Sequence, residues 1–448
     1  MSNLNLSEFD ALFGNLSVPS SSTQENVAKP VNENKIDTTT NANVEAVNTN
    51  NTSNFDTLLH SAQVKMQQIS VEMNNEFVER DKLINLMLLA VTTGTNLLML
   101  GPPGTGKSMI TQNLCHRIDN ANYFQWMLNK TTDPSEVFGP FSIKAMENDK
   151  FMRITTGKLP EAHIAFLDEC YKSNDPMLNA LLTITNEHIF YNDGKPQPVP
   201  LISLFGASNE GPEDESLAAL HDRFIFRMNV NYIGDAGNKK RMHHNYIDNR
   251  AGLSNLVNKT KITLDELKAL QEASKTVRVS KDIVNAFIRL ISDLNRQAIH
   301  VSDRRQNECF KIMQGSAVLA GRKVVSLDDF KALTYVLWEK EEHIPIIESS
   351  ILKMVNPYDD KFKEIKDNFA EIKEKIDQCT DPTIKQQKSL ESKVVIEKLV
   401  GKVNKLVNEA SRNGKDTEDF IKFRDSMVQY NQQLLSSALG ATFNGFGF

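Results

Sequence analysis

Apolar and polar positions follow different patterns in different parts of this chain. Between residues 56 and 230, short apolar runs alternate with stretches of helical periodicity. Such alternation is typical of a parallel sheet with helices on both faces. The predicted strands are 95–100, 123–127, 163–167 and 201–207.

The next part of the chain, from about 235 to 340, is predicted to be entirely helical. Helix-capping signals recur along it, and each predicts a helix start. These signals are Thr263 with Glu266, Ser280, Ser302, and Ser326 with Asp329. We therefore expect a small helical lid domain after the α/β domain.

A third pattern, with apolar residues at alternating spacings of three and four, occupies the chain from 357 to about 435. Each of three stretches predicts one helix with a single apolar seam. The seams are Phe362, Ile365, Phe369, Ile372 and Ile376; Ile396, Leu399, Val403, Leu406 and Ala410; and Phe420, Phe423, Met427, Tyr430 and Leu434. The simplest arrangement is a coiled-coil module of three antiparallel helices with turns at 380–383 and 413–416. Packing of these helices against the rest of the chain remains the alternative.

The first 54 residues are rich in Asn, Ser and Thr, and such a segment cannot bury enough apolar surface to offset ordering. We predict disorder there, although Leu6, Phe9, Leu12 and Phe13 could form a short docking helix. The predicted organisation is a tail (1–54), an α/β nucleotide-binding domain (55–232), a lid (233–345), a triple-helical module (346–436) and a flexible Gly/Phe-rich end (437–448).

The composition of the chain argues against some classes of function. The chain of 448 residues has 51 Lys and Arg against 57 Asp and Glu, so its net charge of −6 argues against a general nucleic-acid binder. Its four cysteines show no metal-ligand spacing, which favours reduced thiols and a cytoplasmic location.

The most apolar stretch, 83–100, is interrupted by polar residues at 92–96. It predicts a helix, a turn and a buried strand, and no membrane span.

A glycine-rich loop after the first predicted strand carries the strongest chemical signal. It fits the phosphate-binding pattern G-x-x-x-x-G-K-[ST], in which backbone N–H groups surround phosphate oxygens. The loop consists of Gly101, Pro102, Pro103, Gly104, Thr105, Gly106, Lys107 and Ser108. Lys107 would neutralise the β- and γ-phosphates of ATP, and Ser108 would give one oxygen to Mg²⁺.

Two further predicted strands end in residues suited to phosphoryl transfer. The run HIAFLDE places Asp168 to hold Mg²⁺ and Glu169 to orient and deprotonate a water. The run LFGASN places Asn209 where it could bind the γ-phosphate or that water, although a strand-end Asn is also a common turn residue. Cys170 is interpreted as a packing residue.

Three arginines are candidates for the positive charge that phosphoryl transfer needs beyond the loop itself. Arg223 follows a short predicted helix, and Arg304 and Arg305 lie in the first turn of a helix capped by Ser302. From the residues alone, a surface ion pair remains the alternative for each arginine.

Taken in order, GPPGTGKS, HIAFLDE, LFGASN, LHDRF and VSDRR resemble the motifs of AAA+ ATPases of the MoxR family. The stretches DPSEVFGPFSI, ITTGKLPEA, LNALLTITNE and ASNEGPE resemble its RavA-like branch. The resemblance implies that Arg223 is the arginine finger that reaches a neighbouring subunit. It also implies that Arg304, or less plausibly Arg305, is the sensor-2 arginine. The backbone near Phe77 to Arg80 would lie beside adenine, with Phe77 and Val78 as the candidate contacts.

The same resemblance implies an assembly and a mode of action. We expect a homo-oligomeric ring, hexameric by analogy, and a chaperone-like role with a partner that carries a von Willebrand factor A domain. Segments 141–155 and 189–203 would form hairpins on the axial side of the ring, with turns at 147–150 and 192–194. The small β-rich domain of RavA-type proteins has no room here, which puts partners that dock on it in doubt. The alternative functions are a nucleic-acid motor and a nucleotide-gated scaffold without turnover.

Overall fold

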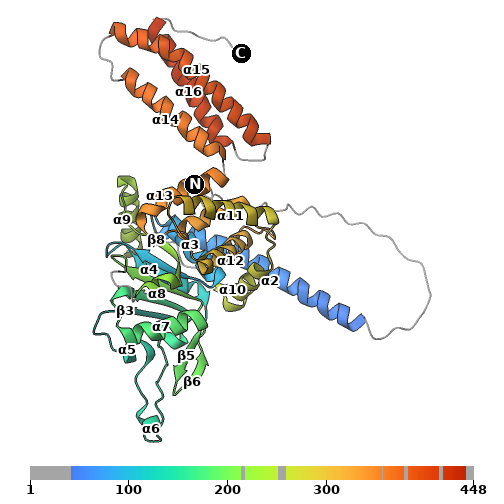
Figure 1. Cartoon of the computed structure of the whole chain (residues 1–448), viewed down its shortest axis with the longest axis vertical. Helices are drawn as coiled ribbons and strands as arrows, with labels where there is room; N and C mark the ends of the chain where they lie inside the picture. The colour runs from blue at the N-terminus through green and yellow to red at the C-terminus, as the bar shows by residue number, and fades with distance from the viewer. Residues whose placement is uncertain are drawn as a thin grey trace, which may run out of the picture. The chain divides into compact units, whose positions relative to one another are not determined.

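The computed structural model describes residues 42–212, 217–250, 259–355, 357–377, 382–412 and 417–439. These residues fall into two compact units, Met1–Ile347 and Glu348–Phe448 (Figure 1). The possible docking helix around Leu6 to Phe13 and residues 440–448 of the Gly/Phe-rich end lie outside the described residues, whereas 437–439 belong to the last helix. The first helix, α2, begins at Ala42, so residues 42–54 are helical where disorder was expected. Once a helix has formed, each added residue gains one backbone hydrogen bond. A helix that is nucleated by the packing of its later residues therefore extends readily toward its N-terminus.

A five-stranded parallel sheet forms the centre of the first unit. Its strands are β1 (Asn96–Leu100), β3 (Tyr123–Met127), β4 (Ile164–Asp168), β7 (Ser203–Ser208) and β8 (Phe224–Asn229). They lie in the order β3-β4-β7-β1-β8, and all four pairings are parallel. The predicted α/β fold class is therefore confirmed, and the four predicted strands match to within one or two residues.

Strand β8 was missing from the predicted set. Its apolar run Phe224–Phe226 is followed by Arg227, a residue type that is seldom buried. In the fold Arg227 is almost fully buried and donates to the carbonyl oxygens of Trp338, at 2.6 Å, and His221, at 3.2 Å. These carbonyl oxygens thus accept hydrogen bonds from the buried guanidinium. Because an arginine is not expected within a buried strand, the apolar pattern did not predict β8.

Helices cover the sheet and form the lid region. They are α2 (Ala42–Glu76), α3 (Asp81–Thr93), α4 (Lys107–His116), α5 (Pro134–Phe138), α6 (Ile143–Met146), α7 (Asp175–Glu187), α8 (Ala218–Arg223), α9 (Ala236–Arg250), α10 (Leu264–Thr276), α11 (Lys281–Arg296), α12 (Asp303–Leu319) and the 3-10 helix η4 (Leu327–Tyr335). Helix α3 contacts β1 and β8 and is itself contacted by α2, α10 and α12. The predicted caps Thr263, Ser280, Ser302 and Ser326 each begin a helix.

The apolar stretch 83–100 forms a helix, a turn and a strand, as predicted. Helix α3 ends at Thr93, Gly94 adopts a left-handed conformation as its C-cap, and β1 begins two residues later. Among the residues that the structure describes, no helix is both long and apolar enough to cross a bilayer.

Two hairpins leave the sheet close to one another. Strands β5 (Ile189–Asn192) and β6 (Lys195–Pro198) pair around the predicted turn, where Asp193 and Gly194 have φ angles of 53° and 69°. The 141–155 segment is closed by an antiparallel bridge between Phe141 and Arg153, as in the predicted hairpin, and the short helix α6 lies at its projecting tip (Figure 1). The Asn192 side chain accepts from the Arg153 N–H at 2.7 Å and donates to its carbonyl at 3.1 Å, so the two hairpins are pinned together.

The second unit contains the C-terminal helices α14 (Pro357–Asp377), α15 (Pro382–Arg412) and α16 (Glu418–Leu439), after α13 (Ile344–Val355). All three predicted seams lie in one apolar cluster, in which rings of Phe362, Phe420 and Phe423 lie 4.4–5.3 Å apart. The seams therefore bury one another. The predicted turn 413–416 lies outside the described residues, and residues 382 and 383 of the other turn begin α15.

Candidate functional site

The glycine-rich loop occupies the turn between β1 and α4. Gly101 has φ 139°, and a Cβ atom there would come within 2.3 Å of the Val230 carbonyl oxygen. Gly106, the N-cap of α4, has φ 86°, a conformation that side chains rarely adopt. Glycine is thus required at both ends of the loop, which leaves its N–H groups and the N-terminus of α4 available to an anion.

Lys107 begins α4 and folds back over the loop. Its Nζ donates to the carbonyl oxygens of Gly101, at 2.6 Å, and Pro102, at 3.0 Å. Burial lowers the pKa of Lys107, and the nearby carboxylates of Asp168 and Glu169 partly oppose that shift. Helix α4 contacts β4, so Lys107 at the start of this helix interacts electrostatically with both predicted acids.

The predicted acids and amide lie at the carboxyl ends of neighbouring strands. Strand β7 pairs with β1 on one side and with β4 on the other, so the ends of all three meet at one edge of the sheet. There the Asn209 amide donates to the Glu169 carboxylate at 3.0 Å. The sequence-based prediction that these two residues lie side by side agrees with this geometry.

Glu169 has an unusual backbone conformation. Its φ of 52° is left-handed, a state that costs a non-glycine residue about 1 kcal/mol or more. Its carboxylate also lies 3.2 Å from the ammonium of Lys172, a neighbour that was not predicted. Asn209 and Lys172 together hold the carboxylate at the strand edge despite the backbone strain.

A cavity of about 820 Å³ adjoins the glycine-rich loop, a size typical of small-molecule sites. It is lined by Glu76, Phe77, Val78, Arg80, Gly104, Thr105, Gly106, Met109, Ile110, Tyr232, Ile233, Lys239, Met242, His243 and Tyr246. Phe77 and Val78 therefore line the cavity beside the phosphate loop, where the base of a nucleotide was expected.

Arg80 ends the stretch whose backbone was expected beside adenine, and its side chain supports the loop, a role that was not predicted. It is 9% exposed, and its guanidinium donates to the carbonyl oxygens of Thr105, at 3.3 Å, and Asn231, at 2.9 Å. An arginine whose side chain donates to backbone carbonyl oxygens belongs to no recognisable sequence motif, so only the fold could identify this role.

The candidate arginines gather around one carboxylate away from this cavity. Asp222 lies 3.3 Å from Arg223 and 3.5 Å from Arg304, and Arg304 also donates to the Asn186 side chain at 3.0 Å. Neither arginine is among the residues that line the cavity. Arg223 directly precedes β8, at the amino ends of the parallel strands, whereas Asp168 and Glu169 lie at the carboxyl end of β4. Arg223 and Arg304, which share Asp222, therefore form a second positive site at the other end of the sheet.

The structure distinguishes Arg305 from Arg304. The Arg305 side chain is 1% exposed and donates to the carbonyl oxygens of Ile225, at 3.1 Å, and Val336, at 2.9 Å, and to Asp222 at 3.2 Å. The Arg304 side chain is 45% exposed. The accessible guanidinium is that of Arg304, whereas Arg305 joins α12 to the sheet.

The donor set fits a magnesium ion. Ser108 lies in α4, which contacts β4, the strand that ends at Asp168. Mg²⁺ is commonly held by one or two protein oxygens together with substrate phosphates. Within the described ranges there is no cluster of three or more His, Cys, Asp or Glu side chains that would form an all-protein metal cage. One hydroxyl and one carboxylate beside a phosphate loop suit a metal that arrives with a nucleotide.

The strand order, the phosphate loop and the acids at the strand ends define a P-loop nucleotide-binding protein with the AAA+ arrangement. A family profile described as the MoxR domain of MoxR-vWA-β-propeller ternary systems matches residues 64–272, and an AAA lid domain profile matches 282–351.

Related proteins extend this agreement over most of the chain. An uncharacterised protein of Methanocaldococcus jannaschii is 34% identical over 384 residues, covering 83% of this chain and 98% of its own. A second one from that organism is 36% identical over 294 residues, covering 65% and 76%. A crystal structure of a candidate ATPase from Cytophaga hutchinsonii, 18% identical, matches 68% of this chain and 98% of its own with a TM-score of 0.56, which supports the fold. The chain belongs to the MoxR family of AAA+ ATPases.

Proposed function

We propose that this protein is a cytoplasmic Mg²⁺-dependent ATP hydrolase that works as a ring of identical subunits and remodels another protein. The observation that carries the proposal is the convergence of Lys107, Asp168, Glu169 and Asn209 at one edge of the sheet. The RavA-like placement within the family is part of this proposal and rests on the sequence stretches quoted above.

Each residue of the site has a role in hydrolysis. The loop N–H groups and Lys107 bind the β- and γ-phosphates, and Ser108 and Asp168 hold Mg²⁺, which neutralises charge on the phosphate oxygens. Glu169 accepts a proton from the attacking water, and the Asn209 amide fixes the direction of its carboxylate at 3.0 Å. The water then attacks the γ-phosphorus in line with the leaving oxygen.

The separation of the arginines from the phosphate loop supports a ring. Phosphoryl transfer needs positive charge near the γ-phosphate, and here Arg223 and Arg304 lie together around Asp222, away from the cavity. In a head-to-tail ring this second site would face the phosphate loop of the next subunit. We therefore propose that both arginines act on a neighbour's ATP and that the ring is a hexamer.

The two pinned hairpins favour a protein substrate over nucleic acid. Their exposed surface carries seven large apolar side chains, and its charges are of both signs, whereas a nucleic-acid motor needs a basic surface. The exposed apolar side chains are Phe141, Ile143, Met146, Phe151, Met152, Ile154 and Tyr191. A partner with a von Willebrand factor A domain agrees with the systems for which the matched family is described.

The direct test is hydrolysis by the full chain and by Glu169→Gln, which keeps the size and hydrogen bonding of the side chain but removes the base. We expect retained ATP binding and hydrolysis reduced by about 10²-fold or more. Lys107→Ala is the matched control, because it should lose ATP binding as well. Near wild-type turnover of Glu169→Gln would overturn the assignment of the base. An inactive wild type that still binds ATP would favour the nucleotide-gated scaffold, and stimulation by DNA would favour the motor.

A further inference from the structure

Helix α8, which ends at Arg223, has little apolar surface that could hold it in place. Among its six residues only Leu220 is buried. A helix of this length is too short to be stable by itself. Its position, and with it the position of the Arg223 side chain, is therefore set by contacts with other elements.

The C-terminal end of α8 is attached through its backbone. The carbonyl oxygens of residues 221–223, which lack the usual partners at a helix end, each accept a hydrogen bond from a side chain of another element. The donors are Arg227 of β8 at 3.2 Å, Arg305 of α12 at 3.3 Å and Asn96 of β1 at 3.3 Å. These bonds attach the end of α8 to two strands of the sheet and to α12.

Tyr171 reaches α8 from the side of the predicted catalytic acid. Glu169 is followed directly by the 3-10 helix η2 (Cys170–Lys172), in which Tyr171 is 9% exposed. The Tyr171 hydroxyl shares a hydrogen bond with Nδ1 of the His221 ring, and the two ring centroids lie 5.9 Å apart. Tyr171 lies two residues after Glu169, and its partner lies two residues before Arg223. The contact is therefore a short connection between the acid and the arginine of one subunit.

Close packing adds a second connection between the same two regions. Cys170, the first residue of η2, is fully buried. A Cβ atom on Gly206 of β7 would lie 3.2 Å from the Cys170 Sγ and 2.5 Å from the ring of Phe224, the residue that follows Arg223. The start of η2 and the start of β8 therefore pack against the same glycine.

The accessibility of the Arg223 guanidinium depends on this placement. Its side chain is 19% exposed, and its Nε is buried without a hydrogen-bond partner among the described residues. One of its terminal nitrogens donates to Asp222 at 3.3 Å, and Asp222 is in turn held by Arg305 at 3.2 Å. A guanidinium that is mostly covered reaches a neighbouring subunit only if its helix presents it in the right direction.

We propose that Tyr171 is a positioning residue for Arg223: through His221 it orients α8, and α8 presents the guanidinium to the ATP of the neighbouring subunit. The inference rests on the proposed function, because it needs an arginine that acts in trans. It adds that a hydroxyl beside the acid of one site controls the rate of hydrolysis in the next site. The effect is on turnover and not on ATP affinity, since neither Tyr171 nor His221 lines the cavity.

The first measurement separates turnover from binding. Tyr171→Phe keeps the ring and removes only the hydroxyl. We expect kcat for ATP hydrolysis to fall about fivefold, the scale of one hydrogen bond, while the affinity for Mg·ATP is unchanged. Tyr123→Phe is the matched control, because it removes a hydroxyl that donates to Gln125 of the same strand at 3.1 Å. This control should change neither value.

The second measurement assigns the loss to one site or to the next. Rings are assembled from equal amounts of Tyr171→Phe and Lys107→Ala, a variant that should not bind ATP but carries an intact Arg223. If Tyr171 acts through the arginine of its own subunit, a Tyr171→Phe subunit beside a Lys107→Ala donor hydrolyses at the full rate. The mixture should then be about 1.5 times as active as the same total amount of Tyr171→Phe alone. If Tyr171 acts on its own Glu169, the mixture should be about half as active.

A reference mixture separates failure of this inference from failure of the proposed function. Arg223→Ala mixed with Lys107→Ala uses the same donor, so recovery of hydrolysis there shows that the donor's arginine works in trans. Recovery in the reference, together with halved activity in the Tyr171→Phe mixture, overturns the inference and leaves the proposed function in place. Wild-type turnover of Tyr171→Phe alone has the same meaning. No recovery in a reference whose mixed rings are verified removes the trans arginine and this inference together.

A second variant tests the other half of the contact and serves if Tyr171→Phe does not fold. His221→Phe removes the acceptor but keeps a ring at this position of α8. It should show the same loss of turnover and the same gain when mixed with Lys107→Ala. Because the two residues act through one hydrogen bond, Tyr171→Phe combined with His221→Phe should lose no more activity than either alone. Additive losses would show that the two residues act separately and would contradict the proposal.

Discussion

At the scale of single residues, adjacent positions in the sequence have very different environments. Arg304 and Arg305 both lie in the first turn of α12, yet one side chain is 45% exposed and the other 1%. The buried guanidinium satisfies the carbonyl oxygens of Ile225 and Val336, which would otherwise lack these bonds. The exposed guanidinium shares Asp222 with Arg223 and remains accessible to a ligand.

This difference predicts opposite effects of two neighbouring substitutions. Arg305→Ala should destabilise the fold by about 3 kcal/mol, because it leaves buried carbonyl oxygens unpaired. Arg304→Ala should change stability by less than about 1 kcal/mol, as exposed ion pairs contribute little, but should reduce hydrolysis. Thermal unfolding and ATPase assays on both variants measure this. An Arg304→Ala protein that is as unstable as Arg305→Ala would contradict the assignment.

A half-buried histidine predicts how stability depends on pH. Burial, aided by the positive charges of Arg227 and Arg305, lowers the pKa of His221 to about 3, and its ring contacts the Tyr171 hydroxyl. The folded state therefore keeps the ring neutral while the unfolded chain takes up a proton below about pH 6.5. Stability should fall as the pH is lowered from about 6.5, by up to roughly 1 kcal/mol per pH unit.

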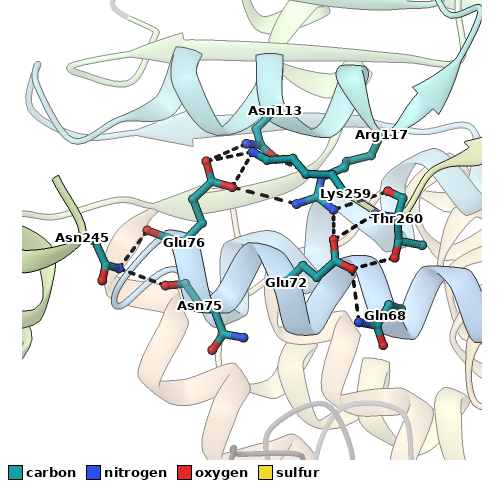
Figure 2. A network of polar contacts seen from close by, with 9 residues as sticks. All are labelled: Gln68, Glu72, Asn75, Glu76, Asn113, Arg117, Asn245, Lys259 and Thr260. Atoms are coloured by element: carbon teal, nitrogen blue, oxygen red, sulfur yellow. Dashed lines mark hydrogen bonds and ion pairs between the residues drawn. The ribbon is translucent and has the colours of Figure 1, made fainter. Parts of the chain in front are cut away.

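The check is the free energy of unfolding between about pH 7 and pH 4.5, measured for the wild type and for His221→Gln. The variant should show a flatter dependence, since it lacks the group that takes up the proton. The measurement stops at about pH 4.5 because Glu72 also affects stability at lower pH. Burial tends to raise the pKa of Glu72, but hydrogen bonds and the ion pair with Arg117 lower it to about 2 (Figure 2). That carboxylate contributes stability above about pH 4.5 and loses it as the pH falls through its folded pKa. Identical slopes above pH 4.5 would contradict the histidine argument.

At the scale of elements, sequence periodicity was most informative where each helix has a single partner surface. The seams of α14, α15 and α16 were recognised because apolar residues at spacings of three and four fall on one side of a helix. The structure places all of them in one cluster that includes Phe369, Val403 and Met427. Helix α9 is the contrasting case, because none of its described residues is buried. It is attached through Asn238, which donates to Glu79, and Asn245, which donates to the Asn75 carbonyl (Figure 2), and such bonds have no periodic signature.

The separate core of the C-terminal helices predicts that they can be removed. Deletion of residues 357–448 takes away the three seams but none of the proposed ATP ligands. We expect the truncated chain to remain folded and to bind ATP, while work on the physiological target is lost. Calorimetric titration with ATP, with circular dichroism to verify folding, measures the first part. A folded truncation that no longer binds ATP would show that these helices contribute to the site.

At the scale of the whole molecule, the separation of the phosphate loop from the arginine site is what the proposed ring would require of a single subunit. The phosphate loop and Glu169 lie at the strand ends, whereas Arg223 and Arg304 surround Asp222. Heterologous contacts in a ring bring two different surfaces of identical subunits together. The structure of a single chain thus agrees with an active site that is formed from two different surfaces on neighbouring subunits of a ring.

Mixing two inactive variants tests whether the site is shared. Lys107→Ala should inactivate the site in which its own subunit binds ATP, and Arg223→Ala should inactivate the site of the neighbour. Random assembly of equal amounts restores about a quarter of the interfaces, so activity should return in mixed rings. Native mass spectrometry verifies that mixed rings form. No recovery in verified mixed rings would count against an arginine that acts in trans.

The sequence by itself determined the features that depend on local pattern. The glycine-rich loop, the acids after β4, the helix caps and the three seams were predicted because each follows from neighbours a few residues apart. The environment of Arg305, the bracing of the loop by Arg80, strand β8 with its buried Arg227 and the attachment of α9 to Glu79 and Asn75 were decided only by the tertiary structure. Most of their partners lie tens to more than a hundred residues away, and a hydrogen bond to a backbone carbonyl places no constraint on the partner's residue type.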